Sequence, residues 1–133
     1  MLVIPEHIYR QMVEHAREDY PLEACGILGG DKNGVVEIHR MTNTDRSGVH
    51  FAMEPREQFA VVKELRSKGL RILAVYHSHP STPARPSEED IRLAFTPGIS
   101  YVIVSLKDLS KPDVRSFHIG NGQVTSEDLS VIP

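Results

Sequence analysis

The feature that most constrains the fold is a continuous apolar run, Ile72 to Tyr76, that leads directly into His77-Ser78-His79-Pro80. An unbroken apolar run predicts a strand buried on both faces, because a strand with one solvated face alternates apolar and polar residues. Such a strand lies inside a sheet and needs a covering layer on each side. Pro80 has no N–H to donate, so it ends the strand and places the two histidines at its mouth.

The rest of the chain predicts those layers. Amphipathic helices are expected from Pro5 to just before Pro21 and from about Pro55 to Lys68, with a short third helix from Ser87 to about Phe95. Further strands are expected at 24–30, 35–41, 99–106, 114–119 and 123–126, the first two joined by an Asn33-Gly34 turn. This order, α-β-β-α-β-α-β-β, is typical of a mixed α/β (α+β) fold, and we expect residues 1–133 to form a single domain.

The apolar faces of the two longer helices should pack on the sheet. The first helix repeats Ile8, Met12 and Ala16 every four residues. In the second helix, Phe59, Val62 and Leu65 form the expected buried stripe.

Composition excludes several classes of function. The net charge is -3, the pI is near 6.1, and no run of basic residues is present, so we expect no nucleic-acid partner. The single cysteine, Cys25, rules out an intramolecular disulfide and a cysteine-rich structural zinc site. The apolar stretch from Met1 to Ile4 is too short for a signal peptide, and no apolar run approaches membrane-spanning length. We therefore expect a cytoplasmic protein with no membrane partner.

His77 and His79 are the first candidate ligands of a metal ion. Residues two apart on a strand point to the same face, so both imidazoles can reach one ion. Alone, this pair is a weak signal, because histidines at strand ends are often ordinary polar termini. Asp90 strengthens it: two histidines and one carboxylate form the ligand set of a catalytic zinc site, with water as the fourth ligand.

Asp90 also has a purely structural interpretation. In Ser87-Glu88-Glu89-Asp90, Ser87 suits the N-cap of a helix and Asp90 its third position, where an acid suits the helix dipole. On this segment alone the capping role is favoured. The loop from His79 to Asp90 is nevertheless long enough to fold the helix start back onto the strand end.

Taken together, these residues match a known pattern. His77-Ser78-His79-Pro80, followed by six residues, Ser87, two residues and Asp90, resembles the JAMM motif of the MPN-domain metallopeptidases. The family also has a glutamate upstream, before a Cys-Gly-rich apolar strand, and Leu22-Glu23-Ala24-Cys25-Gly26-Ile27-Leu28-Gly29 matches it. The resemblance covers nearly the whole chain. It implies an MPN-like three-layer domain, with a central mixed β-sheet flanked by helices.

The resemblance also implies roles for these residues. His77, His79 and Asp90 would bind Zn²⁺. Glu23 would be the general base that accepts a proton from water, whereas on residue chemistry alone it is better read as a solvated carboxylate between a helix and a strand. Ser87 would hydrogen-bond the oxyanion, a role that its hydroxyl can combine with the N-cap.

The resemblance further implies a substrate, and rival functions stay open beside it. We expect hydrolysis of an amide bond after the C-terminal Gly-Gly of a ubiquitin-like or sulfur-carrier protein. The alternatives are a non-catalytic MPN scaffold, a peptidase acting on other peptides, and a metal hydrolase of another class. A deaminase is disfavoured because it needs Cys-x-x-Cys, and a two-metal phosphoesterase because it needs more carboxylates.

The remaining candidates have ordinary structural explanations. His50 could line the cleft but is better explained as a surface histidine, and Cys25 as a buried small hydrophobe. His118 has no evident partner. Three further histidines are expected to be solvated: His7, His15 and His39.

Overall fold

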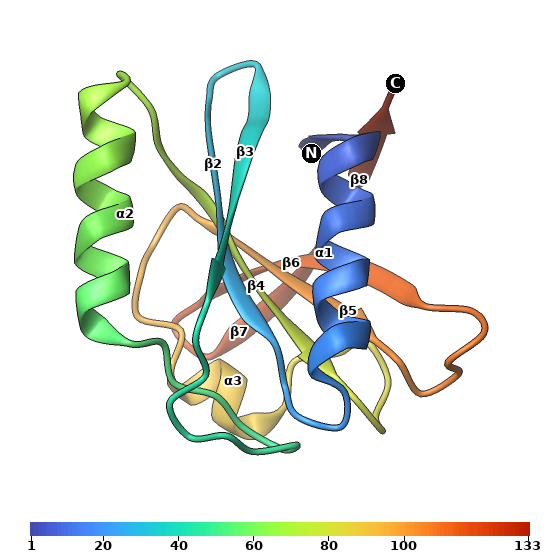
Figure 1. Ribbon diagram of the computed structural model, residues 1–133. Helices are drawn as coiled ribbons and strands as arrows, with labels where there is room; N and C mark the ends of the chain where they lie inside the picture. The colour runs from blue at the N-terminus through green and yellow to red at the C-terminus, as the bar shows by residue number, and fades with distance from the viewer.

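A computed structural model describes all residues, 1–133, and contains three helices and eight strands (Figure 1). The helices are α1 (Glu6–Asp19), α2 (Pro55–Ser67) and α3 (Glu88–Arg92). The strands are β1 (Leu2–Pro5), β2 (Cys25–Asp31), β3 (Gly34–Met41), β4 (Arg71–His79), β5 (Ser100–Ser105), β6 (Asp113–Gly120), β7 (Gln123–Glu127) and β8 (Leu129–Ile132). All three helices fall short of the length and apolar character that a membrane-spanning helix requires.

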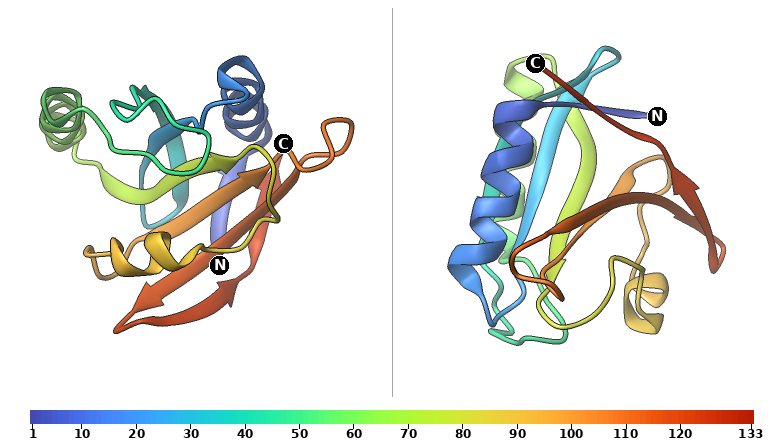
Figure 2. Two further views of the ribbon diagram at one scale, coloured as in Figure 1. Left: turned by 90° about the horizontal axis from the view of Figure 1, so that it is seen from below. Right: turned by 90° about the vertical axis from the view of Figure 1, so that its right-hand side faces the viewer.

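Six strands form one mixed sheet in the order β3-β2-β4-β5-β6-β7. Only β4 and β5 run parallel, and every other neighbouring pair is antiparallel. The apolar run in β4 therefore lies inside the sheet, as the sequence predicts. Figure 2 shows that the sheet is strongly twisted, so that β6 and β7 run at a large angle to β2 and β3.

The helices cover both faces of this sheet, which confirms the three-layer architecture. The face bearing Leu28, Tyr76 and Val102 packs on α1, whose buried residues include Ile8 and Met12. The opposite face packs on α2 near β2 and β4, and on the segment that carries α3 near β5 and β6. The two cores on this second face leave the end of β4 between α2 and α3, which is where the candidate site lies.

Tyr76 explains why glycine lies within the second strand. Gly26 pairs directly with Tyr76 across the β2–β4 ladder. A Cβ atom built on Gly26 would overlap the Tyr76 ring, so the ring occupies the space above that glycine. Tyr76 is 1% exposed, and its hydroxyl donates to His15 Nδ1 over 2.7 Å. The glycine at position 26 is therefore required by the packing of Tyr76 on the neighbouring strand.

The short terminal strands were not predicted. β1 and β8 pair in parallel with each other and belong to a separate two-stranded sheet. Each has only four residues, which is too few to show the alternation of apolar and polar side chains that marks a strand. Because β1 includes Pro5, the first helix begins at Glu6 rather than at Pro5, and Pro5 is its N-cap residue.

Two predicted details of the later helices are wrong. The buried positions of α2 are Val61 and Leu65, spaced one turn apart, whereas Phe59 is 74% exposed. Phe59 lies off the stripe that this spacing defines, so it faces away from the sheet. In addition, α3 ends at Arg92 rather than at Phe95, and Phe95 is exposed.

Candidate metal centre

His77 and His79 lie at the end of β4 on one face of the sheet, as their spacing predicts. Both residues are buried, with 3% and 4% exposure, and their rings lie edge to face with centroids 4.9 Å apart. Ser78 between them points to the other side and accepts a hydrogen bond from the Ala24 amide. The strand therefore presents two imidazoles to one point from a rigid, central position in the sheet.

Asp90 completes this group from α3. Its Oδ2 atom lies 3.1 Å from His77 Nε2 and 3.1 Å from His79 Nε2, and the two Nε2 atoms are also 3.1 Å apart. Tetrahedral coordination with bonds of about 2.0–2.1 Å separates two ligand atoms by roughly 3.4 Å. The observed triangle needs to expand only slightly to hold such an ion, so His77, His79 and Asp90 fit a metal.

The same Asp90 oxygen also caps the helix. Ser87 N–H donates to Asp90 Oδ2 over 2.9 Å, and Asp90 N–H donates to Ser87 Oγ over 3.0 Å, which forms a reciprocal capping box. The capping role that the sequence favours for this segment and the metal-facing position therefore coexist on one carboxylate. The box fixes the orientation of Asp90 before any ion binds.

The loop between His79 and Asp90 is fastened to the sheet at several points. His79 Nδ1–H donates to Pro83 O over 2.9 Å, and Ser105 Oγ–H on β5 donates to Thr82 O over 2.6 Å. Ala84, 2% exposed, packs into the core beneath the loop. When the His79 ring is neutral, its bond to Pro83 places the remaining proton on Nδ1, which leaves Nε2 free to bind a cation.

The charges of the group are arranged to suit a cation. Burial raises the pKa of Asp90, but hydrogen bonds from His77 and His79 outweigh it and hold that pKa well below its usual range. Burial lowers the pKa of His77. Burial also lowers the pKa of His79, but its bonds to Asp90 and Pro83 outweigh this and leave the pKa raised. The group thus combines the ionised carboxylate of Asp90, the neutral imidazole of His77 and the imidazole of His79, which protonates more readily than an ordinary histidine.

Glu23 lies beside this group, two residues before β2 begins. It is 4% exposed, and its Oε1 atom is buried without a hydrogen-bond partner. Burial raises the pKa of Glu23 to about 7, opposed by the charge of His79 and reinforced by that of Asp90. The interpretation of Glu23 as a solvated carboxylate is therefore wrong, because the β2–β4 pairing buries it against the ends of both strands.

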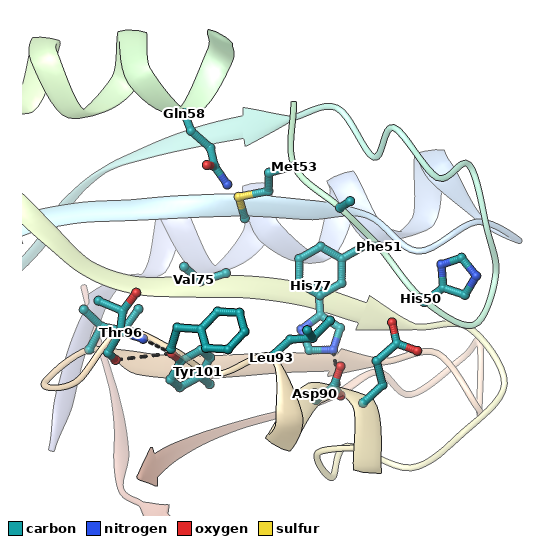
Figure 3. A pocket seen from close by; sticks show the side chains of 14 residues that line it. His50, Phe51, Met53, Gln58, Val75, His77, Asp90, Leu93, Thr96 and Tyr101 are labelled. Carbon is teal, nitrogen blue, oxygen red and sulfur yellow. Dashed lines mark hydrogen bonds and ion pairs between the residues drawn. The ribbon is translucent and has the colours of Figure 1, made fainter. Parts of the chain in front are cut away.

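A groove of about 470 Å³ opens beside His77 and Asp90 (Figure 3). Figure 3 shows Phe51 and Met53 on one side, Leu93 and Tyr101 on the other, and His77 between Phe51 and Asp90. The Phe51 ring stacks on the His77 imidazole, with centroids 4.6 Å apart and an angle of 27° between the planes. Phe51 was missed in the sequence, because an aromatic residue in a loop carries no signal of what it covers.

The other histidines have varied surroundings. His50 lines the groove with its side chain 40% exposed and pairs with Asp45, so it is both a surface and a cleft residue. His118 contacts Glu127 Oε2 at 2.8 Å. His15 is buried at 4% exposure, contrary to prediction, because it follows Met12 by three residues on the inward stripe of α1.

His39, also expected to be solvated, is only partly exposed and lies with Glu37 and Glu64 in a second group of possible ligand atoms. Lys68 Nζ already pairs with both carboxylates of that group, at 3.1 and 3.5 Å. This group is a surface ion-pair network between β3 and α2. Cys25 is fully buried, as expected, and packs in the core beneath α2.

Comparison with known proteins gives consistent matches. Residues 5–120 match the family described as prokaryotic homologs of the JAB domain. The chain is 38% identical over 134 residues to a CysO-cysteine peptidase of Mycobacterium tuberculosis, covering 99% of this chain and 92% of the relative. It is 34% identical over 101 residues to a desampylase of Haloferax volcanii, covering 71% and 73% of the two chains.

Solved structures agree with the fold. The solution structure of a protein from Desulfitobacterium hafniense superposes with a TM-score of 0.90 at 43% identity, covering 99% of this chain and 93% of that one. A JAB1/MPN domain protein from Archaeoglobus fulgidus superposes over the full length of both chains with a TM-score of 0.69 at 22% identity. At that identity the second likeness concerns the fold alone.

Proposed function

The chain belongs to the prokaryotic homologues of the JAB domain, and from this premise we propose that it is a zinc-dependent peptidase. The observation that carries the proposal is the triangle of His77 Nε2, His79 Nε2 and Asp90 Oδ2, with all three sides 3.1 Å long. Two imidazoles and one carboxylate are a ligand set of catalytic zinc and leave a fourth position open. A scaffold module has no use for two buried imidazoles and a carboxylate arranged in this way.

In this proposal, the chain supplies the ligands, a base and a hydrogen-bond donor. Bound zinc supplies Lewis-acid chemistry, which polarises a carbonyl and makes water acidic enough to attack at neutral pH. Glu23 is the general base, since a carboxylate with a pKa of about 7 can take a proton from water and release it to the leaving amine. Its buried, unpartnered Oε1 supports that role, because no hydrogen bond within the protein already occupies this oxygen.

Ser87 is proposed to bind the oxyanion that forms during hydrolysis. Its Oγ accepts a hydrogen bond from Asp90 N–H, which uses one lone pair and leaves the hydroxyl proton free to donate. The capping box holds Ser87 against the oxygen of Asp90 that faces the histidines. The cap thus orients this donor, and losing one such donor typically costs about 10²–10³ in rate.

We propose that the substrate is a ubiquitin-like or sulfur-carrier protein cleaved after its C-terminal Gly-Gly. The relatives named CysO-cysteine peptidase and desampylase support this class. The groove beside His77 also supports it, because its apolar walls, Phe51 and Met53 on one side and Leu93 and Tyr101 on the other, suit an extended tail. A tail that ends in glycines can approach the metal without side chains that would clash.

A cleavage assay tests this proposal. Zinc-loaded protein is incubated with a small Gly-Gly-ending carrier fused to a C-terminal peptide, and products are identified by mass spectrometry. We expect cleavage after the second glycine, loss of cleavage with a chelator, recovery with zinc, and no cleavage by a zinc-loaded Glu23→Gln variant. A fusion with Ala-Ala in place of Gly-Gly is the control substrate and should resist cleavage.

Two outcomes would contradict the proposal. A zinc-loaded protein that cleaves none of these fusions would favour the scaffold alternative. Equal cleavage of the Gly-Gly fusion, the Ala-Ala fusion and short unrelated peptides would favour a general peptidase.

A further inference from the structure

We infer that Asn43 is the positioning residue that holds Glu23 in place beside the metal centre. Asn43 lies after β3, at the start of the loop that leads to Met53. This inference rests on the proposed role of Glu23 as general base, and it adds a residue that neither the sequence motif nor the metal ligands include.

The Glu23 side chain is not anchored by its own carboxylate, since its buried Oε1 atom has no hydrogen-bond partner. Its direction therefore depends on how firmly its backbone is held. The backbone is fastened on both sides by one loop: Glu23 N–H donates to Ser47 O over 2.7 Å, and Asn43 Nδ2–H donates to Glu23 O over 3.1 Å. The neighbouring Ala24, in contrast, is bonded to Ser78 on β4.

Asn43 can perform this task because it also organises the loop. Its second Nδ2–H donates to His50 O over 3.2 Å, and its Oδ1 accepts from the amides of Asp45 and Ala52 at 3.0 and 3.1 Å. The two N–H groups of the Asn43 side chain donate to two carbonyl oxygens, and its Oδ1 accepts from two backbone amides. Only one orientation of the side-chain amide satisfies all four bonds. Asn43 is 9% exposed, and an isosteric aspartate would lack both donors.

Gly48 shows how closely the loop packs against the segment that carries Glu23. A Cβ atom on Gly48 would lie 2.7 Å from the Pro21 carbonyl oxygen, which is closer than real Cβ contacts allow. The close approach of Gly48 to Pro21 is thus a second contact of the loop, and any side chain at position 48 would disturb it. The loop therefore packs against both Pro21 and Glu23.

The same loop reaches the metal side of the groove. Phe51 stacks on His77. Its two neighbours in the chain are both bonded to Asn43, through His50 O and the Ala52 amide. Asn43 therefore fixes two parts of the site at once, the backbone of the base and the ring that covers one ligand. Displacement by about 1 Å at a reacting group can cost on the order of 10² in rate.

The test compares Asn43→Asp with Thr44→Val in the full-length, zinc-loaded protein. Thr44 is the matched control, because its Oγ1 donates to Ala52 O in the same loop but does not touch Glu23. For Asn43→Asp we expect one zinc per chain, a KM within about threefold, and a kcat lowered about 10²-fold. For Thr44→Val we expect a kcat within about twofold of the wild type.

A second readout does not depend on activity. Exchange of the Glu23 amide proton, measured by NMR on the zinc-loaded protein, should accelerate at least about tenfold in Asn43→Asp, because the loop that supplies Ser47 O is released. In Thr44→Val it should stay close to the wild-type rate. If Asn43→Asp does not fold, Asn43→Ala replaces it, because alanine removes the same two side-chain donors without adding a charge, and it should give the same combination of retained zinc, lowered kcat and faster exchange.

Several outcomes separate this inference from the proposed function. Unchanged kcat and unchanged Glu23 exchange in Asn43→Asp or its substitute, with Glu23→Gln inactive, would overturn the inference alone. Loss of zinc, or equal losses of kcat in Asn43→Asp and Thr44→Val, would also overturn it by showing only general loss of structure. A wild-type protein that cleaves no fusion would overturn the proposed function, and the exchange data would still decide whether Asn43 holds Glu23.

Discussion

Ala24 and Ser78 are joined by a reciprocal pair of hydrogen bonds. Ser78 N–H donates to Ala24 O over 3.0 Å, and Ala24 N–H donates to Ser78 Oγ over 2.8 Å. The pair fastens the residue that precedes β2 to the end of β4. It therefore fixes the spacing between Glu23, one residue before, and the two histidines on either side of Ser78.

Ser78→Ala should destabilise the protein by about 1–3 kcal/mol, because it leaves the buried Ala24 amide without its acceptor. Urea denaturation of the metal-free protein measures the free energy of unfolding. Ser110→Ala is the control, since the Ser110 hydroxyl bonds only to the exposed Asp108 carboxylate, and it should change stability by less than about 0.5 kcal/mol. Equal stability of the two variants would show that the bond from the Ala24 amide to the Ser78 hydroxyl contributes nothing.

Asp90 Oδ2 is both a proposed zinc ligand and the acceptor that caps α3. Asp90→Ala should remove both functions, while Asp90→Asn should remove only the zinc ligand. We expect both variants to lose zinc affinity by on the order of 100-fold or more, because a neutral amide is a poor ligand for zinc. Asparagine can still accept the bond from Ser87 N–H, so only the alanine variant should lose a further ~1 kcal/mol of stability. Zinc titration and denaturation measure the two effects.

Glu88→Ala is the control for this pair, since Glu88 lies in the same helical turn but outside the ligand group. It should keep wild-type zinc affinity. Full zinc occupancy in Asp90→Ala under competition with a chelator would exclude Asp90 as a ligand.

Zinc binding should weaken as the pH falls. The pKa of His79 is raised because bonds to Asp90 and Pro83 outweigh burial, so the protonated form persists to higher pH than in an ordinary histidine. Zinc must displace that proton, and affinity should fall by up to about tenfold per pH unit below the pKa. Isothermal titration in buffers of different ionisation enthalpy should show net proton release. An affinity that stays constant between about pH 7.5 and 5.5 would contradict this assignment.

The sequence predicted the parts of the site that depend on local geometry. The spacing of His77 and His79 on a strand, and of Ser87 and Asp90 across one helical turn, follows from the periods of those elements, and both pairs have the expected geometry. The central strand was also predictable, because five apolar residues in succession need two covering layers. These features require no knowledge of distant residues.

The remaining features depend on contacts between segments far apart in the chain. Pro83 contributes only a carbonyl oxygen to His79, and every residue has one, so no residue type marks it. Asn43 looks like an ordinary loop asparagine until Glu23 and His50 are brought beside it. The position of His15 on the inward stripe of α1 was readable from its spacing, but its hydrogen bond to Tyr76, 61 positions away, was not.

Cys25 should be inert in the folded protein. The residue is fully buried, and burial raises the pKa of its thiol to about 12, so almost no thiolate exists at pH 8. Iodoacetamide at pH 8 should neither label the native protein nor lower its activity, while a chelator should abolish that activity. Labelling in urea is the positive control. Alkylation of the native protein with parallel loss of cleavage would favour a cysteine-dependent mechanism instead.

Glu23→Gln should stabilise the metal-free protein at high pH but much less at low pH. Burial raises the pKa of Glu23 from 4.5 to about 7 in the folded state. Below pH 4.5 the carboxyl is protonated in both folded and unfolded chains, so its charge costs nothing. As the pH rises through 7, the folded protein must hold a buried carboxylate, which destabilises it by up to about 3 kcal/mol. Glutamine carries no charge and avoids this cost.

The measurement is the difference in unfolding free energy between Glu23→Gln and wild type at pH 4.5 and pH 8, in a chelating buffer. That difference should increase in favour of the variant as the pH rises, with its midpoint between 4.5 and about 7. Glu88→Gln, an exposed control, should show no such trend. Zinc should reduce the effect in the wild type, because a nearby cation stabilises the ionised carboxylate. A difference independent of pH would mean that Glu23 is not the buried base proposed for this site.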